Sequence, residues 1–287
     1  MRTAFIGLGV MGYPMAGHLQ KAGCEVVVYN RSSERAQAWV AQYGGQCAET
    51  PAAAAACADL ILVCVGNDDD VRSVVFGQQG VLAGAPEGAI VVDHTTASAD
   101  LARELEQACA ANKLGFLDAP VSGGQAGAEN GQLTVMVGGK EDVFTRAKPL
   151  LEHYARCVRL LGGAGSGQLA KMVNQVCIAG VVQGLAEGLH FAEQAGLDAA
   201  AVVEVISQGA AQSWQMNNRY QTMLAGEYEH GFAVDWMRKD LGIVLEEAKR
   251  LGMELELTQQ VDKYYAEVQD MGGGRWDTSS LLARLKD

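Results

Sequence analysis

The segment Gly7-Leu8-Gly9-Val10-Met11-Gly12 constrains the fold of this chain more than any other feature of the sequence. It follows a short apolar run, Thr3–Ile6, and leads into a helix-like segment, Met11–Ala22. Glycine costs about 0.5–1 kcal/mol relative to alanine inside a regular element, so clustered glycines indicate a tight turn or a close approach to a ligand. A GxGxxG pattern between a strand and a helix predicts a βαβ unit whose helix N-terminus binds the phosphates of a dinucleotide. We therefore expect these six residues to bind a dinucleotide cofactor.

The residues after the next strand-like run, Cys24–Tyr29, indicate which dinucleotide is bound. An NAD site usually carries Asp or Glu about 20 residues after the glycine loop, where it binds the ribose 2′-hydroxyl. Here the chain continues with Asn30, Arg31 and Ser32 instead of a carboxylate. A guanidinium suits a 2′-phosphate, and the other two side chains offer neutral hydrogen bonds. We predict a preference for NADP, with NAD possible if Arg31 only stacks on the adenine.

The first half of the chain alternates strand-like and helix-like segments. Further strands are expected at Leu60–Val65, Ala89–Asp93, Gly115–Ala119, Leu133–Val137 and Val158–Leu161, and helices at Glu34–Tyr43, Leu101–Asn112 and from about Ala52. This rhythm predicts a parallel sheet covered by helices on both faces. The fold class is therefore α/β, with a Rossmann dinucleotide-binding domain over residues 1–162.

The character of the sequence changes after Gly162, where strand-like runs end. Gln168–Gln194 is mostly apolar and predicts one long helix, and shorter helices are expected at about 198–208, 212–225, 234–251, 256–271 and 277–285. We therefore expect residues 163–287 to form an all-helical domain joined to the first by the long helix. Such a helix is difficult to bury within one small domain, so we predict a homodimer or homotetramer.

Composition excludes several classes of function. The chain is 49% hydrophobic and 20% charged, as globular proteins are, and its net charge of −12 argues against binding to nucleic acid. The seven cysteines form no CxxC pair and there is no HExxH motif, so we expect no metal site and reduced thiols, as in the cytoplasm. No secretory signal and no uninterrupted apolar stretch of about 18 residues are found, so no membrane segment is expected.

Other predicted strand ends carry polar residues. Ligands of open α/β sheets bind at the carboxyl ends of the strands, so Val65, Gly66, Asn67 and the segment through Thr96 are expected to line the nicotinamide half of the cofactor. His94 lies in that segment, and we expect it to be a lining or surface residue rather than an acid–base group.

Two segments are candidates for the chemistry. Ser122, Gly123 and Gly124 could bind a substrate carboxylate through a hydroxyl and backbone N–H groups, or could form a plain glycine-rich turn. Lys171 and Asn174 are three residues apart and share a face of the long helix. A partly desolvated lysine has a lowered pKa and can transfer protons, whereas a surface lysine would extend over the apolar helix into solvent.

In these motifs the chain resembles the β-hydroxyacid dehydrogenase family, which includes 3-hydroxyisobutyrate dehydrogenase, tartronate semialdehyde reductase and the glyoxylate and succinic semialdehyde reductases. The matching motifs, in order, are GLGVMG, DAPVSGG, GSGQLAKMVNQ and the later Arg238-Lys239-Asp240-Leu241. The resemblance implies Lys171 as the catalytic lysine and Asn174 as its substrate-binding partner. It also implies Thr96 and Lys239 as cofactor contacts, Ser122–Gly124 as the substrate loop, and Asp240 as a residue of the substrate site.

The resemblance and the residues support one reaction, hydride transfer between NADP and a small 3-hydroxy acid or its semialdehyde, with Lys171 as the general acid and base. The segment Asn30-Arg31-Ser32 is similar to NADP-using members, and the pair Asn174-Gln175 to tartronate semialdehyde reductases, so the substrate stays open. An imine reductase usually replaces the lysine, and 6-phosphogluconate dehydrogenase has a longer C-terminal domain. A non-catalytic NADP-binding regulator is the remaining alternative.

Overall fold

The structure is a computed structural model that describes residues 1–286. It contains two compact units, residues 1–171 and residues from Met172 onward. The division falls within helix α9 (Ser166–Gln194), later in the chain than the domain boundary expected at Gly162. The first turn and a half of this helix, up to Lys171, therefore belongs to the first unit.

The first unit is built on a nine-stranded sheet whose described strands follow the order β3-β2-β1-β4-β5-β6-β8-β7, with β9 beside β8. Six strands are parallel: β1 (Arg2–Ile6), β2 (Glu25–Tyr29), β3 (Gln46–Cys47), β4 (Leu60–Val63), β5 (Ile90–Asp93) and β6 (Gly115–Asp118). Their carboxyl ends therefore lie along one edge of the sheet, as the alternating pattern predicts. The two-residue strand β3 was not predicted, because it is too short to show a periodic pattern of apolar residues.

The sheet is parallel in its first six strands, as expected, and becomes mixed at its last strands. β8 (Leu133–Gly139) runs antiparallel to β6 and to β7 (Val121–Ser122), and is parallel only to β9 (Ala155–Gly162). A parallel neighbour requires a crossover connection of about a dozen residues, whereas an antiparallel one can be joined by a short return. Here the chain returns from β7 to β8 through only the short helix α7 (Gly124–Glu129).

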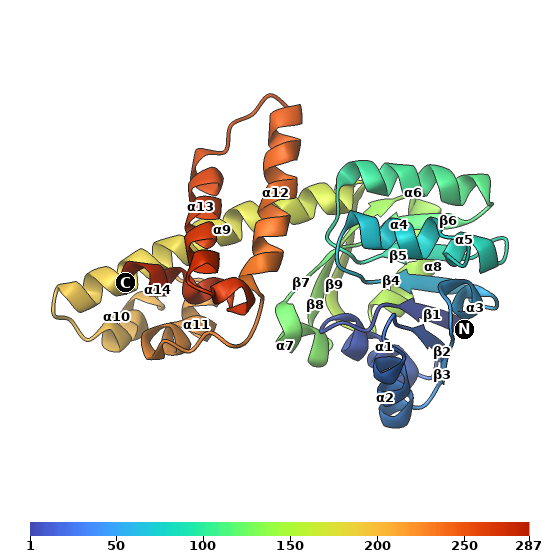
Figure 1. Ribbon diagram of the computed structural model, residues 1–287, viewed down its shortest axis with the longest axis horizontal. Helices are drawn as coiled ribbons and strands as arrows, with labels where there is room; N and C mark the ends of the chain where they lie inside the picture. The colour runs from blue at the N-terminus through green and yellow to red at the C-terminus, as the bar shows by residue number, and fades with distance from the viewer. Residues whose placement is uncertain (287) are drawn as a thin grey trace. The chain divides into compact units, whose positions relative to one another are not determined.

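Helices cover both faces of this sheet, as expected (Figure 1). The strands alternate: Phe5 of β1 packs into one hydrophobic core, whereas Ala4 and Ile6 pack into the other. The first core is covered by α1 (Gly12–Lys21), α2 (Ser33–Tyr43) and α8 (Glu141–Leu151). The second is covered by α3 (Pro51–Ala55), α4 (Asp68–Phe76), α5 (Val81–Gly84) and α6 (Ala99–Ala111).

The second unit is helical. After α9 it contains α10 (Ala199–Ile206), α11 (Trp214–Ala225), α12 (Val234–Arg250), α13 (Glu256–Asp270) and α14 (Leu281–Lys286). The helix expected at 277–285 is divided, because Asp277 caps a 3-10 turn, Thr278–Ser280, that precedes α14. The core of this unit packs Val182 and Leu189 of α9 against Met237 and Leu241 of α12 and Tyr265 of α13.

Helix α9 is the one described helix that is long and apolar enough to cross a membrane, judged by length and composition alone. The mean hydropathy of its best window is 1.3, and 44% of that window is buried inside the structure. The core helix of a globular protein has the same properties, so this is weak evidence. The expectation that the chain has no membrane segment stays a prediction.

Candidate active site

The three glycines of the loop between β1 and α1 meet different surroundings. Gly7 has φ +98°, and a Cβ there would lie 2.2 Å from the carbonyl oxygen of Cys64. A Cβ on Gly12 would lie 2.1 Å from the carbonyl oxygen of Gly7, whereas a Cβ on Gly9 would meet nothing within 4 Å. The fold itself thus requires glycine at positions 7 and 12, while Gly9 leaves open space at the N-terminus of α1. This arrangement fits the pyrophosphate of a dinucleotide.

Two side chains of the following βα segment hold the loop. The amide N–H of Leu8 donates to Asn30 Oδ1 over 2.9 Å, and the carbonyl of Leu8 accepts from Arg35 Nε. The Arg35 guanidinium lies 5.0 Å from the centre of the Tyr13 ring. Asn30, predicted to contact the cofactor, is therefore also a support of the loop. Arg35 was missed by the sequence analysis, although it lies one turn after Arg31 at the start of α2.

Arg31 is the exposed cation at the carboxyl end of β2. Its side chain is 92% exposed, and its nearest acidic atom is Asp70 Oδ1 at 3.8 Å. An exposed ion pair of this kind contributes at most about 1 kcal/mol, so an anionic ligand could displace it. Ser32, the next predicted contact, precedes α2 and donates its hydroxyl to Glu34 Oε2 over 2.7 Å.

The predicted nicotinamide-lining segments follow neighbouring strands β4 and β5. The amide of Val65 donates to Thr95 Oγ1 over 3.0 Å, which joins the two strand ends. Asn67 caps helix α4 by accepting from the amide of Asp70 over 2.9 Å. The partly buried Gly66 and Thr96 lie beside these two links.

His94 is neither a lining nor a surface residue, contrary to the expectation from sequence. It is 2% exposed, and its two ring nitrogens lie 2.6 Å from the Ala119 carbonyl and 2.8 Å from the Tyr154 hydroxyl. The carbonyl can only accept, so Nδ1 carries the proton and Nε2 accepts from the tyrosine. Burial lowers the pKa of His94 to about 4, which keeps the imidazole neutral and structural.

The carboxylate of Asp118, at the end of β6, anchors the start of helix α9. Its Oδ1 accepts from the amide of Gly165 over 2.8 Å, and its Oδ2 accepts from the amide of Gln168 over 2.9 Å. Burial raises the pKa of Asp118, and these amide hydrogen bonds act in the opposite direction. The turn that follows carries Lys171, which is only 8% exposed. The alternative of a lysine extended into solvent is therefore excluded.

The loop Ser122-Gly123-Gly124 joins β7 to α7. Gly123 has φ +133° and Gly124 has φ +61°, conformations that side chains rarely adopt. Both glycines are exposed and Ser122 is partly buried. The two glycines therefore form an exposed turn, and the role of this loop in substrate binding stays a prediction.

The predicted site residues of the second unit form a hydrogen-bonded chain. Asn174 Nδ2 donates to Gln175 Oε1 over 2.7 Å, and Gln175 Nε2 donates to Asp240 Oδ2 over 2.7 Å. The other carboxylate oxygen of Asp240 lies 3.0 Å from Lys239 Nζ. Since a carboxylate only accepts, Asp240 fixes the orientation of the Gln175 amide, which in turn fixes that of Asn174. The sequence singles out Gln175 only as part of a pair that is similar to tartronate semialdehyde reductases, and its two hydrogen bonds indicate this orienting role.

The structure thus gathers the predicted residues into two groups. The first unit brings the loop Gly7–Gly12, the ends of β2, β4 and β5, and the turn of Lys171 to the carboxyl edge of its sheet. The second unit joins Asn174, Lys239 and Asp240. Helix α9 contributes to both. Trp214, Phe232 and Trp236, whose roles the sequence leaves open, are 50%, 36% and 38% exposed.

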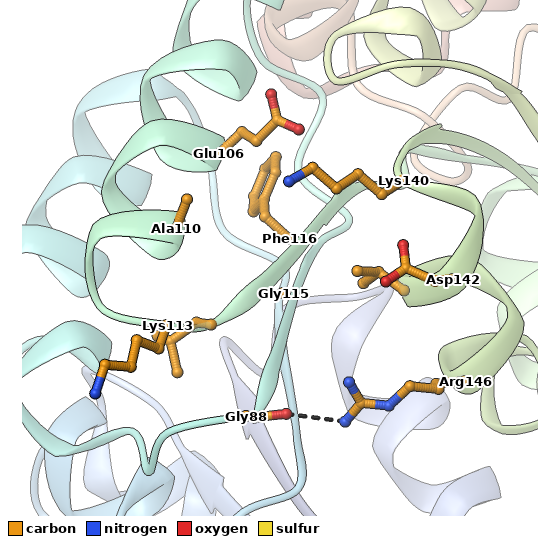
Figure 2. A pocket seen from close by; sticks show the side chains of 11 residues that line it. Gly88, Glu106, Ala110, Lys113, Gly115, Phe116, Lys140, Asp142 and Arg146 are labelled. Atoms are coloured by element: carbon orange, nitrogen blue, oxygen red, sulfur yellow. Dashed lines mark hydrogen bonds between the residues drawn. The ribbon is translucent and has the colours of Figure 1, made fainter.

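A separate pocket lies at the opposite edge of the sheet (Figure 2). Gly88 precedes β5 and Gly115 begins β6, so this pocket is at the amino ends of strands whose carboxyl ends carry the predicted site. Its basic residues Lys113, Lys140 and Arg146 are interspersed with the acidic Glu106 and Asp142, and Arg146 donates to the carbonyl of Gly88 over 2.9 Å. The pocket is therefore distinct from the dinucleotide site.

Among residues 1–286, no group of three or more His, Cys, Asp or Glu side chains is placed to hold a metal ion. That the chain requires no metal stays a prediction.

Two protein families match the chain in succession. The family described as the NAD binding domain of 6-phosphogluconate dehydrogenase matches residues 2–163. The family described as NAD-binding of NADP-dependent 3-hydroxyisobutyrate dehydrogenase matches residues 165–285. Together they cover nearly the whole chain and include both groups of site residues.

Relatives match over nearly their full length. An uncharacterized oxidoreductase of Shewanella frigidimarina is 63% identical over 99% of this chain and 98% of its own. The probable 3-hydroxyisobutyrate dehydrogenase-like 1 of Arabidopsis thaliana is 38% identical over 99% of this chain and 85% of its own. The 2-hydroxy-3-oxopropionate reductase of Escherichia coli is 34% identical over 100% of this chain and 97% of its own.

Solved structures agree with these relatives. The 3-hydroxyisobutyrate dehydrogenase of Salmonella typhimurium is 32% identical, with a TM-score of 0.88 over 99% of both chains. The structure of Psf3 in complex with NADP⁺ and 2-OPP is 26% identical, with a TM-score of 0.89 over 99% of both chains. The open space at Gly9, the buried Lys171 and these matches lead to one conclusion. The chain belongs to the β-hydroxyacid dehydrogenase family and is an NAD(P)-dependent oxidoreductase.

Proposed function

We propose that this enzyme prefers NADP and interconverts a small 3-hydroxy acid, similar to 3-hydroxyisobutyrate, and its semialdehyde, with Lys171 as the general acid and base. The observation that carries this proposal is the placement of Lys171. Its side chain is 8% exposed, on a helix whose first turn is bound to the carboxyl end of β6. That edge of the sheet is also where the glycine loop leaves room for the cofactor.

NADPH supplies the hydride when it is bound. As the carbonyl of the substrate is reduced, the Lys171 ammonium donates a proton to the developing alkoxide, and its charge stabilises that oxygen. In the oxidative direction the neutral amine accepts the hydroxyl proton. Ser122 and the backbone amides of Gly123 and Gly124 bind the substrate carboxylate, and Asn174, three residues after Lys171 on the same helix, is the proposed polar partner of the substrate.

The preference for NADP rests on Arg31. The exposed Arg31 guanidinium would exchange a 3.8 Å contact with Asp70 for a 2′-phosphate. Position 30 is Asn, so it has no carboxylate that could bind a 2′-hydroxyl. We expect a higher kcat/KM with NADPH than with NADH, and Arg31→Ala should weaken NADPH binding far more than NADH binding. The matched control is Arg103→Ala, since Arg103 is a partly exposed arginine of α6 that pairs with Asp100. A wild-type preference for NADH would overturn this part of the proposal.

The substrate is proposed at the level of its class. Matched relatives include 2-hydroxy-3-oxopropionate reductase and 2-(hydroxymethyl)glutarate dehydrogenase, two proteins whose names give different substrates. A second candidate substrate is tartronate semialdehyde, which the pair Asn174-Gln175 favours. Pockets discriminate a single methylene by only about 10–200-fold, so small acids must be compared side by side.

The test is a screen of 3-hydroxyisobutyrate, tartronate semialdehyde, glyoxylate and succinic semialdehyde with both cofactors, followed by the absorbance of the reduced nicotinamide. Turnover of 3-hydroxyisobutyrate with the highest kcat/KM supports the first candidate, and preference for tartronate semialdehyde the second. Cofactor binding without turnover of any of these compounds would instead support a non-catalytic regulator. Solved imine reductases match at 22% identity, which supports a shared fold alone, and Lys171 argues against imine chemistry.

A further inference from the structure

The side chain of Gln168 makes hydrogen bonds to the backbone on both sides of Thr96. Its Oε1 accepts from the amide of Ala97 over 3.1 Å, and its Nε2 donates to the carbonyl of Thr95 over 2.7 Å. An amide N–H can only donate and a carbonyl can only accept, so this pair of bonds fixes the orientation of the Gln168 carboxamide. The residue is 1% exposed and lies in the first turn of α9, three residues before Lys171.

The surroundings of Gln168 leave little freedom of movement. Its own backbone amide is held by Asp118 Oδ2 over 2.9 Å, and a Cβ on the preceding Gly167 would lie 2.7 Å from the carbonyl oxygen of Asp118. On the other side, Thr95 is tied to β4 through the amide of Val65. The ends of β4, β5 and β6 and the first turn of α9 are therefore joined by one hydrogen-bond network, which is buried except at the partly buried bond of Val65.

We infer that Gln168 is a positioning residue that sets the placement of Lys171 relative to the cofactor-lining segment at Thr96. This inference rests on the proposed roles of those two residues. Proton and hydride transfer require the reacting groups to be aligned closely, and a misplacement of about 1 Å can lower the rate about 10²-fold. Gln168 links the two groups directly, because its side chain holds the Thr96 segment while its backbone belongs to the helix that carries Lys171.

The first experiment compares Gln168→Leu with Gln183→Leu in the full-length enzyme. Gln183 is a matched control because it is also a buried glutamine of α9, 3% exposed, and it donates to Glu187 over 2.7 Å in the second unit. We expect Gln168→Leu to lower kcat about 10²-fold with little change in the KM for NADPH. The amide of Ala97 should also exchange with deuterium faster, since it has lost its acceptor. Gln183→Leu should change neither quantity.

The second experiment uses Gln168→Glu, which keeps the shape of the side chain. A neutral carboxyl can donate to the Thr95 carbonyl and accept from the Ala97 amide, whereas an ionised one only accepts and faces the Thr95 oxygen. The activity of Gln168→Glu, divided by that of the wild type, should therefore rise as the pH falls. Asp118 and Asp93 titrate nearby in every variant, so the same ratio for Gln168→Leu, which should stay flat, corrects for them.

The outcomes separate this inference from the proposed function. If the wild type turns over none of the compounds in the screen, the proposed function fails, while deuterium exchange at Ala97 still tests the hold of Gln168 on the Thr96 segment. Faster exchange with unchanged kcat would overturn the positioning role. An equal loss of kcat in Gln183→Leu would also overturn it, because a general loss of helix stability would then explain both. If Gln168→Leu does not fold, a pH-independent activity ratio for Gln168→Glu would be the contradicting result.

Discussion

Lys171 is a buried lysine near the start of helix α9. If it is the proton donor, Lys171→Ala should lower kcat by about 10²–10⁴-fold, the range that general acid–base catalysis supplies. The affinity for NADPH should change little, because the phosphates are expected at Gly7–Gly12. Steady-state kinetics and a fluorescence titration of NADPH measure the two quantities. A nearly normal kcat would remove Lys171 from the mechanism.

Lys171→Arg separates proton transfer from charge stabilisation. The guanidinium keeps the positive charge but holds its proton too tightly and has a different shape. We expect it to fail nearly as fully as Lys171→Ala. Substantial activity with arginine would indicate that the charge alone is needed.

His94 makes the stability of the first unit depend on pH in a defined direction. Its pKa is about 4 when folded against a reference value of 6.5, so between these values the unfolded chain binds more protons and stability rises with pH. Asp93 has the opposite effect, because burial raises its pKa from 3.8 to about 7. Between these two values the folded chain binds more protons than the unfolded chain, so the contribution of Asp93 to the free energy of unfolding decreases as the pH rises. The two effects partly cancel in the wild type.

A variant separates these two titrations. In His94→Gln the histidine contribution is absent, so the free energy of unfolding should increase less steeply with pH from about 4 to 6.5. The difference in slope from the wild type should be about 1 kcal/mol per pH unit. Urea denaturation at several pH values measures it, and His153→Gln, a histidine outside this buried pair, is the control. Parallel curves for His94→Gln and wild type would contradict a buried neutral His94.

At the scale of the element, two glycines of the β1–α1 loop are expected to have different roles. Gly12 is required by the fold, whereas Gly9 is expected to leave space for the cofactor. Gly12→Ala places a Cβ 2.1 Å from the Gly7 carbonyl, so it should lower the free energy of unfolding by about 1–3 kcal/mol. Gly9→Ala meets no atom of the chain within 4 Å. It should leave stability within about 0.5 kcal/mol while weakening NADPH binding at least about tenfold.

Denaturation curves and an NADPH titration of the two variants provide the comparison, each variant serving as the control of the other. Unchanged NADPH affinity in Gly9→Ala would show that the open space at this glycine is not where the pyrophosphate binds.

At the scale of the whole molecule, one face of α9 stays exposed despite its apolar character. Val173 is 65% exposed and Phe191 is 72% exposed, and a Cβ added at Gly184 or Gly188 between them would meet nothing within 4 Å. These positions fall on one side of the helix, and glycines there allow a second backbone to approach closely. We propose that a second copy of the chain covers this face in a homodimer, alone or within a homotetramer.

The predicted result is a dimeric or tetrameric mass by light scattering at micromolar concentration, and a lower mass for Gly184→Glu, which places a charge in the covered face. Gln107→Glu adds the same charge to α6, outside this face, and should leave the mass unchanged. A monomeric wild type would refute the proposal.

The sequence by itself determined the elements that have a strong local signal. These elements each have a periodicity or composition that is typical of one structure. They are the glycine loop, the apolar runs of β2, β4 and β5, and the long apolar segment of α9. The Rossmann and helical parts and the family could therefore be predicted before any contact was known. Lys171 could be singled out for the same reason, because a lone lysine among apolar neighbours is conspicuous.

Only the tertiary structure decided what depends on residues far apart in the chain. Three features join segments that no short window of sequence contains. They are the antiparallel pairing of β8 with β6, the hydrogen bond between the buried His94 and Tyr154, and the hydrogen bonds of Asn30 and Arg35 with Leu8. Gln168 and Gln175 illustrate the reason most clearly. An uncharged amide in a helix has no distinctive local signal, and its role is set by the donors and acceptors that folding brings to each end of it.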